Sequence, residues 1–137
     1  MTNVIIWNEN IHEVENEEVK KIYPKGIHGC IKDFLSTDNS LKIKTATLKE
    51  DQNGLSEELL KNCDVVIWWG HKAHDEVLDK TVDLVQRRVL EGMGLIVLHS
   101  GHHSKIFKRL MGTNCKLTWR ESVSYTHLRA HETPMSL

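Results

Sequence analysis

Three short apolar segments that do not alternate with polar residues constrain the fold of this chain most. They cover residues 4–7, 65–69 and 94–98, and β-branched residues are frequent in them. A strand that is apolar on both faces is typical of a parallel sheet covered by helices on both sides. Between these segments, apolar residues recur at helical spacing, most clearly over residues 75–91. The sequence therefore predicts an α/β fold with a parallel sheet and helices on both faces.

The remaining elements are predicted from local signals. Residues 42–48 alternate polar and apolar side chains, which predicts a strand with one wet face at an edge of the sheet. The helix at 75–91 has Asp75 and Glu76 at its start and Gly92 just past its end, a charge and glycine pattern that suits a helix of this length. Further helices are predicted at residues 17–22, 27–35, 56–60 and 105–111, with Ser56 capping the third of them.

Composition excludes several classes of function. The chain has 137 residues and a net charge of −1, which gives no electrostatic case for nucleic acid or an anionic membrane as a partner. Three cysteines without CxxC spacing favour reduced thiols, and we expect a cytoplasmic protein without a signal peptide or membrane span. Histidine is unusually frequent in the composition, with nine residues. A small molecule is therefore the expected partner.

The histidines gather where the predicted buried strands end. In a parallel sheet all these strands end at one edge, and open α/β sheets bind ligands just beyond that edge. We therefore predict one shared site there, which we call the carboxyl rim. Its predicted residues are Trp7, Asn8, Glu9 and His12 after the first strand, Gly70, His71 and His74 after the second, and His99, Gly101 and His102 after the third.

Several occupants of this rim remain open. Imidazole and carboxylate are common ligands of zinc or a similar divalent ion, for which His71, His74, His99 and His102 are the candidates. Histidine is also a general acid or base near neutral pH. The predicted helix start after His74 favours anions and neutral imidazole, so a sugar hydroxyl cluster or a carboxylate is an alternative occupant. A single histidine beside the start of a helix more often caps that helix than binds a ligand.

The turn after the third apolar segment occupies the place where hydrolases carry a nucleophile. When the elbow pattern G-x-nucleophile-x-G is aligned by Gly101, its nucleophile position holds His99, and Val97 replaces the first glycine. No cysteine lies at this turn, and Ser100 is one position away, so a covalent serine or cysteine mechanism is not expected. The candidate catalytic residues are His71 and His99, without an assigned reaction.

Several motifs resemble one family. The segments VIIWNE, YPKGIH, TATL, VVIWWGHKAHDEV, VQRRVLEGMGLIVLHSGHHSKIFKRLMGT and LTWRE are similar to the ThuA-like (trehalose utilisation) proteins from about residue 2 to 121. The resemblance implies a class I glutamine amidotransferase-like, flavodoxin-type fold without the amidotransferase cysteine. It also implies a role in catabolism of trehalose and related disaccharides. By the same motifs, the resemblance implies that His28 is a site residue in addition to the rim residues named above.

Two functions are consistent with these features. The first is binding of a sugar or keto-sugar at the carboxyl rim, with the histidines as ligands or as acid and base. The second is a non-catalytic binding or regulatory module on an amidotransferase-like scaffold that has lost its nucleophile. The sequence does not decide whether the protein is an enzyme.

The chain departs from the family near its end. Family members continue through further strands, so we expect residues 1–122 to be the N-terminal portion of a ThuA-like domain. Residues 123–137 resemble a translated sequencing adapter and are expected to be non-native, which removes His127 and His131 from the site. A truncated sheet would expose a strand edge and apolar faces, which favours marginal stability and association into a homo-oligomer.

Overall fold

The computed structural model describes residues 1–118 and contains a four-stranded parallel sheet with the order β2-β1-β3-β4. The strands are β1 (Thr2–Asn8), β2 (Leu41–Thr47), β3 (Val65–Trp69) and β4 (Gly94–Val97). The helices are α1 (His12–Glu15), α2 (Glu17–Ile22), α3 (Gly26–Leu35), α4 (Glu57–Lys61), α5 (Asp79–Leu90) and α6 (Lys105–Met111), and the 3₁₀ turns are η1 (Asp51–Gly54), η2 (His74–Glu76) and η3 (His99–His103).

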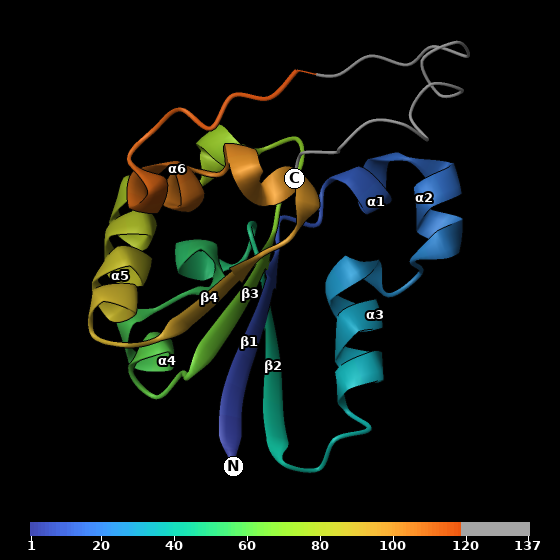
Figure 1. The fold of residues 1–137 in the computed structure, drawn as a ribbon. Coiled ribbons are helices and arrows are strands. Elements are labelled where there is room, and N and C mark those ends of the chain that lie inside the picture. Colours follow the sequence, from blue (N-terminus) through green and yellow to red (C-terminus); the bar gives the residue numbers. More distant parts are fainter. Residues whose placement is uncertain (119–137) are drawn as a thin grey trace, which may run out of the picture.

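The order of the strands places helices on both faces of the sheet. The chain moves in one direction from β1 to β2 and in the opposite direction from β2 to β3 and β4. Right-handed crossovers therefore put α3 on one face and α4 and α5 on the other, as Figure 1 shows. The strand order reverses between β1 and β3. The fold is flavodoxin-like, as expected, and the switch point of the sheet lies between β1 and β3.

Two stacked tryptophans form the centre of the core. The ring centroids of Trp7 and Trp68 lie 3.9 Å apart with 18° between the ring planes, and each residue is 1% exposed. Their neighbours in the core cluster include Leu55, Leu60, Val82 and Val85, which come from the segment before α4, from α4 and from α5. Trp69 is only half-buried, because side chains alternate along β3 and turn it to the opposite face.

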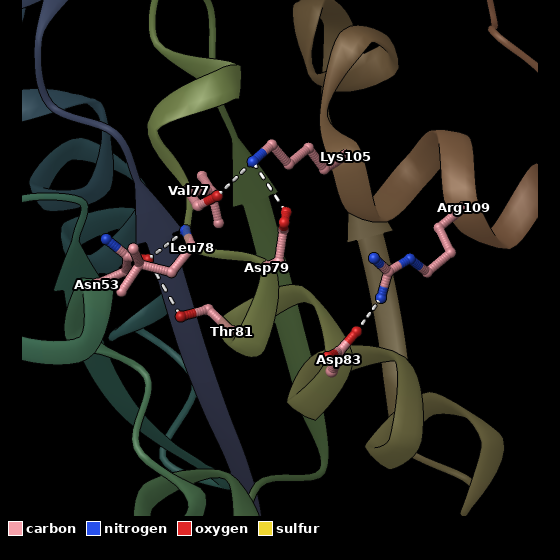
Figure 2. A network of polar contacts seen from close by, with 8 residues as sticks. All are labelled: Asn53, Val77, Leu78, Asp79, Thr81, Asp83, Lys105 and Arg109. Carbon is pink, nitrogen blue, oxygen red and sulfur yellow. Dashed lines mark hydrogen bonds and ion pairs between the residues drawn. The ribbon is translucent and has the colours of Figure 1, made fainter.

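The helix predicted at residues 75–91 begins later than expected. Residues His74–Glu76 form the turn η2, and α5 starts only at Asp79. Two side chains from elsewhere cause this break (Figure 2). The Asn53 Oδ1 accepts hydrogen bonds from the Leu78 amide at 2.9 Å and the Thr81 hydroxyl at 3.1 Å, and Lys105 Nζ donates to the Val77 carbonyl at 2.7 Å. The backbone groups before α5 are therefore bonded outside the helix.

Two ion pairs join α5 to α6. Lys105 Nζ lies 3.1 Å from Asp79 Oδ1, and Arg109 of α6 pairs with Asp83 of α5 (Figure 2). These ion pairs are largely exposed, so each contributes little to stability by itself. Their effect is to orient α6, which comes after the histidine-rich turn η3, against α5.

The outer strands confirm one prediction and correct another. The strand at 42–48 was expected at an edge, and β2 occupies one edge with alternating exposure. The segment at 94–98 was expected to be buried on both faces, but β4 is the other edge of the sheet formed by residues 1–118, and Ile96 is 50% exposed. The prediction of buried faces was wrong there, because α3 packs on β1 and β2 and, among the described residues, leaves the face of β4 that carries Ile96 open.

The other helices at 17–22, 27–35, 56–60 and 105–111 are confirmed to within a residue, including the Ser56 cap on Leu59. Three elements were not predicted, namely α1, η1 and η3. The proposed boundary at 122 and the tail at 123–137 lie outside the described residues and stay predictions. Within the described part of the chain, no helix combines the length and hydrophobicity that crossing a membrane requires.

Candidate functional site

The carboxyl ends of β1, β3 and β4 meet at one rim, as the sequence predicted. The Glu9 amide donates to the Trp69 carbonyl at 3.2 Å, which ties the end of β1 to the end of β3. The Ser100 hydroxyl donates to the Gly70 carbonyl at 2.8 Å, which ties the loop after β4 to the loop after β3. The rim therefore has a fixed backbone frame at the switch point of the sheet.

Glu9 holds this frame together from inside. It is 1% exposed, and its two carboxylate oxygens accept from backbone amides, Oε1 from Lys72 at 2.6 Å and Oε2 from Ala73 at 2.8 Å. Hydrogen bonds from amides to a buried carboxylate are among the stronger ones in proteins. Glu9 was predicted as a ligand-binding residue, whereas its oxygens here position the loop that carries His71 and His74.

One group of rings forms around His71. Its ring centroid lies 4.8 Å from that of His12 and 5.9 Å from that of Trp69, whose ring it faces at 23°. His71 and His99 are exposed, while Trp69 and His12 are half-buried. An aromatic face and imidazole nitrogens are thus presented to solvent side by side.

A second group forms around His74. Its ring lies 6.2 Å from His103, and His103 lies 4.0 Å from His102. Gly70 makes room for the His74 ring, because a Cβ at Gly70 would stand 3.1 Å from His74 Nδ1. His102 Nδ1 is 3.1 Å from the His99 carbonyl and must donate to it, so Nε2 keeps its lone pair. Among the described residues this buried Nε2 has no hydrogen-bond partner.

Partial desolvation at the rim favours the neutral forms of His71 and His74. It lowers the pKa of His71 below its usual 6.5, the neighbouring His12 lowers it further, and Glu9 opposes the shift. It also lowers the pKa of His74 below 6.5, where Glu9 again opposes the shift and His103 adds to it. The lowered pKa values agree with the expected neutrality, but their causes are desolvation and neighbouring charge rather than the start of a helix, because α5 begins only at Asp79.

The lowered pKa values predict how stability depends on pH. Below pH 6.5 the unfolded chain binds protons that His71 and His74 resist in the fold, so the free energy of unfolding falls as pH drops from 6.5 through the lowered pKa values. Urea unfolding at about pH 7.5 and 5.5 measures this loss. A double variant, His71→Gln with His74→Gln, should lose less. An equal loss in both proteins would show that other groups carry the pH dependence.

The turn after β4 shares one backbone feature with a nucleophile elbow. His99, which occupies the nucleophile position, has a φ of +38°, a left-handed conformation that is uncommon for a residue with a side chain. Gly101 is required at its position, because a Cβ there would stand 2.6 Å from Val97 Cγ1. Such local strain is often found at functional sites. The structure thus gives His99 an elbow setting without a serine or cysteine nucleophile.

Besides Glu9, three predicted site residues with side chains are drawn into the core or into a neighbouring cluster. Trp7 and Asn8 are fully buried, and Trp7 Nε1 donates to the Asn53 carbonyl at 2.8 Å inside the core. His28 joins a separate cluster, in which Asn8 Nδ2 lies 2.7 Å from Glu13 Oε2 and 2.9 Å from His28 Nδ1. Asn8 thus faces away from the rim histidines toward α1 and α3.

The arrangement does not form a metal centre. Among residues 1–118, no three His, Cys, Asp or Glu side chains come together in a way that could hold a metal ion. His71 packs beside Trp69, His74 faces His103, and the Nδ1 of His102 is used by the His99 carbonyl. The four predicted zinc ligands His71, His74, His99 and His102 are therefore not assembled into a ligand set.

Sequence reasoning missed three residues of this region. Glu13 is a buried carboxylate, but it lies in an acidic stretch that reads as solvated. The His103 ring lies between those of His102 and His74 in tilted arrangements, although only His102 was among the predicted rim residues. Asn53 fixes the start of α5 from a loop 25 residues earlier. Only the excess of histidine in the composition pointed to His103, and no local pattern pointed to the other two.

Fold and rim together define a flavodoxin-like α/β protein with a histidine-rich site at the switch point of its sheet. The sequence profile of the ThuA family, described as trehalose utilisation, matches residues 3–136. The chain therefore belongs to the ThuA family, as its motifs indicated. A search of curated proteins found no match.

Proposed function

We propose that this protein binds a sugar or keto-sugar of disaccharide catabolism at the carboxyl rim. The observation that carries the proposal is the convergence of six histidines from three strand ends on one frame clamped by Glu9, namely His12, His71, His74, His99, His102 and His103. The membership in a family described as trehalose utilisation supports a sugar as the ligand.

The chemistry of the rim suits hydroxyl groups. A neutral imidazole offers one N–H donor and one lone pair, so each ring can both donate to and accept from a hydroxyl. The half-buried ring of Trp69 next to His71 offers an apolar face for sugar C–H groups. A neutral His71 could also remove a proton beside a carbonyl, which is the step that a keto-sugar would allow, and His99 on the next loop is the second candidate base.

The elbow supports a second function. Because its nucleophile position holds His99, the rim has the frame of an amidotransferase-like site without the nucleophile of a covalent mechanism. A non-catalytic binding or regulatory module is therefore the alternative. The unpaired state of all three cysteines fits the reducing conditions of the cytoplasm, where we place the protein under either function.

Calorimetric titration with trehalose and a keto derivative of trehalose tests the proposal on the 137-residue chain. Replacing His71 and His74 together by alanine should weaken binding at least about tenfold, which corresponds to about 1.4 kcal/mol. Lys80→Ala, an exposed change on α5, is the control and should bind as the parent does. Equal affinity in the double variant, or no saturable binding of either sugar, would refute rim binding. Binding with turnover favours the first function, and binding without turnover favours the second.

A further inference from the structure

A second hollow is lined by Glu13 and His28 and by none of the rim histidines His71, His74, His99, His102 and His103. It has a volume of about 260 Å³, is open to solvent on one side, and is lined by one continuous stretch of chain, from the loop after β1 through α1 and α2 to the first turn of α3. Its walls are Asn10, Glu13, Val14, Lys20, Tyr23, Pro24, Lys25, Gly26 and His28. The rim function does not use this hollow, which we call the α1–α3 hollow.

The carboxylate of Glu13 has one oxygen that no described residue engages. Glu13 is 2% exposed, and its Oε2 accepts from Asn8 Nδ2 and from the Ile27 amide, both at 2.7 Å. Its Oε1 is buried and, within residues 1–118, has no hydrogen-bond partner. An unsatisfied buried oxygen of a carboxylate is costly, so this atom favours a donor from outside the described residues, either a bound water or a ligand hydroxyl.

His28 offers the opposite group, and the network fixes its tautomer. The Asn10 amide donates to Asn8 Oδ1 at 3.0 Å, so the amide group of Asn8 points its Nδ2 at Glu13 and His28. Since Asn8 Nδ2 donates, His28 Nδ1 must accept, and the ring proton is on Nε2. Burial lowers the pKa of His28, although Glu13 and Glu50 oppose the shift. A neutral ring with an Nε2 donor therefore lines the hollow.

The backbone at Gly26 is shaped to keep this ring in place. Gly26 has a φ of +78°, and a Cβ there would stand 2.5 Å from His28 Cε1 and 3.3 Å from Asn10 Oδ1. Any other residue at this position would displace the ring and strain the backbone. The seat of His28 thus depends on a glycine in the sequence YPKGIH.

We propose that the α1–α3 hollow binds a small neutral polyhydroxylated molecule, with one hydroxyl donating to Glu13 Oε1 and a second accepting from His28 Nε2–H. Charge decides between ligand classes. An anion would be repelled by the buried Glu13 carboxylate, and a cation would be repelled by Lys20 at the wall, where Lys25 is already paired with Asp33 at 3.1 Å. A neutral polyol avoids these charges and uses the acceptor and the donor together.

The size of the hollow limits the ligand. Pockets for drug-sized molecules begin at about 300 Å³, so 260 Å³ suits a short polyol or a single sugar ring. Tyr23 adds an aromatic face and a hydroxyl to the wall. This site is independent of the rim, and its ligand need not be the molecule that the rim binds.

Amide NMR of the uniformly ¹⁵N-labelled full chain, titrated with glycerol, xylitol and glucose, tests the site. We expect saturable shifts at Gly26 and at Ile27, whose amide contacts Glu13. Glu13→Gln removes the carboxylate charge and half of its acceptor capacity, so it should weaken binding at least tenfold. Lys21→Ala, on α2 but outside the wall, is the control and should not change binding.

Three results would overturn the proposal. They are shifts without saturation for all three polyols, equal saturation in Glu13→Gln, and stronger shifts with phosphate or ammonium than with any polyol. The parent titration alone decides the first and third, so they hold even where a variant fails to fold. Replacing His71 and His74 leaves the α1–α3 hollow intact, so loss of binding at the rim and loss of binding here are separately detectable.

Discussion

Replacing Glu9 by alanine is expected to lower the free energy of unfolding by about 3–5 kcal/mol, because two backbone amides lose a buried, charged acceptor. Those amides belong to Lys72 and Ala73, at 2.6 and 2.8 Å from the carboxylate. Glu9→Gln keeps one acceptor and should cost about half as much. Urea unfolding measures both changes.

The control for the Glu9 substitutions is a change at Glu76, another acidic residue, in the turn η2 after β3. Glu76 is exposed in η2, and Glu76→Ala should change stability by less than about 0.5 kcal/mol. Hydrogen exchange adds a local measurement, since the amides of residues 72 and 73 should exchange faster in Glu9→Ala than in the Glu76 variant. A cost below about 1 kcal/mol with unchanged exchange would show that Glu9 does not hold the loop.

The same variant connects stability to the proposed function. His71 and His74 reach the rim on the loop that Glu9 clamps, so Glu9→Ala should weaken sugar binding even under conditions where the protein stays folded. Glu9 itself is 1% exposed and has both oxygens occupied by backbone amides. It therefore acts as a positioning residue, and its effect on a ligand passes through the histidines.

The parallel sheet and its rim could be predicted because both depend on short-range pattern. Apolar runs without alternation indicate buried parallel strands, and parallel strands must end at one edge. The chain order of β1, β3 and β4 then brings Glu9, His71 and His99 to that edge without any tertiary information. The residues directly after each strand were therefore enough to locate the site.

The start of α5 could not be predicted, because its determinants are distant in the sequence. Asp75 and Glu76 look like a first helical turn, but Asn53 and Lys105 bond the backbone at 77 and 78 from elements before and after it. A local pattern contains no information on either partner. The same limit applies to Glu13, whose burial depends on Asn8 and on the amide of Ile27.

Exposure was the least predictable property of the individual side chains. Trp7 was a candidate for ligand contact, but it stacks with Trp68 in the core, and of the three tryptophans at the strand ends only Trp69 is partly open. Alternation predicts that Trp68 and Trp69 face opposite sides of the sheet, but it does not tell which face the helices cover more fully. That depends on the direction in which the chain crosses the sheet, which the strand order sets.

The stacked tryptophans give the second large expected effect. Trp7→Ala and Trp68→Ala should each lower the free energy of unfolding by about 3–5 kcal/mol, because each removes a fully buried indole. That is a large fraction of the roughly 5–15 kcal/mol that a domain of this kind has. The double variant should cost less than the sum, since the stacking between the rings is worth about 0.5–1.5 kcal/mol and is lost only once.

Phenylalanine at the same two positions separates packing from hydrogen bonding. Both changes remove a similar volume, but Trp7 Nε1 donates to the Asn53 carbonyl at 2.8 Å, whereas Trp68 Nε1 has no partner among the described residues. Trp7→Phe should therefore cost about 1–2 kcal/mol more than Trp68→Phe, because it leaves a buried carbonyl without its donor. Asn53 also fixes the start of α5, so this difference should appear as faster amide exchange at Leu78 in Trp7→Phe alone. Equal costs for the two changes would mean that the Trp7–Asn53 bond adds nothing to the stability of the fold.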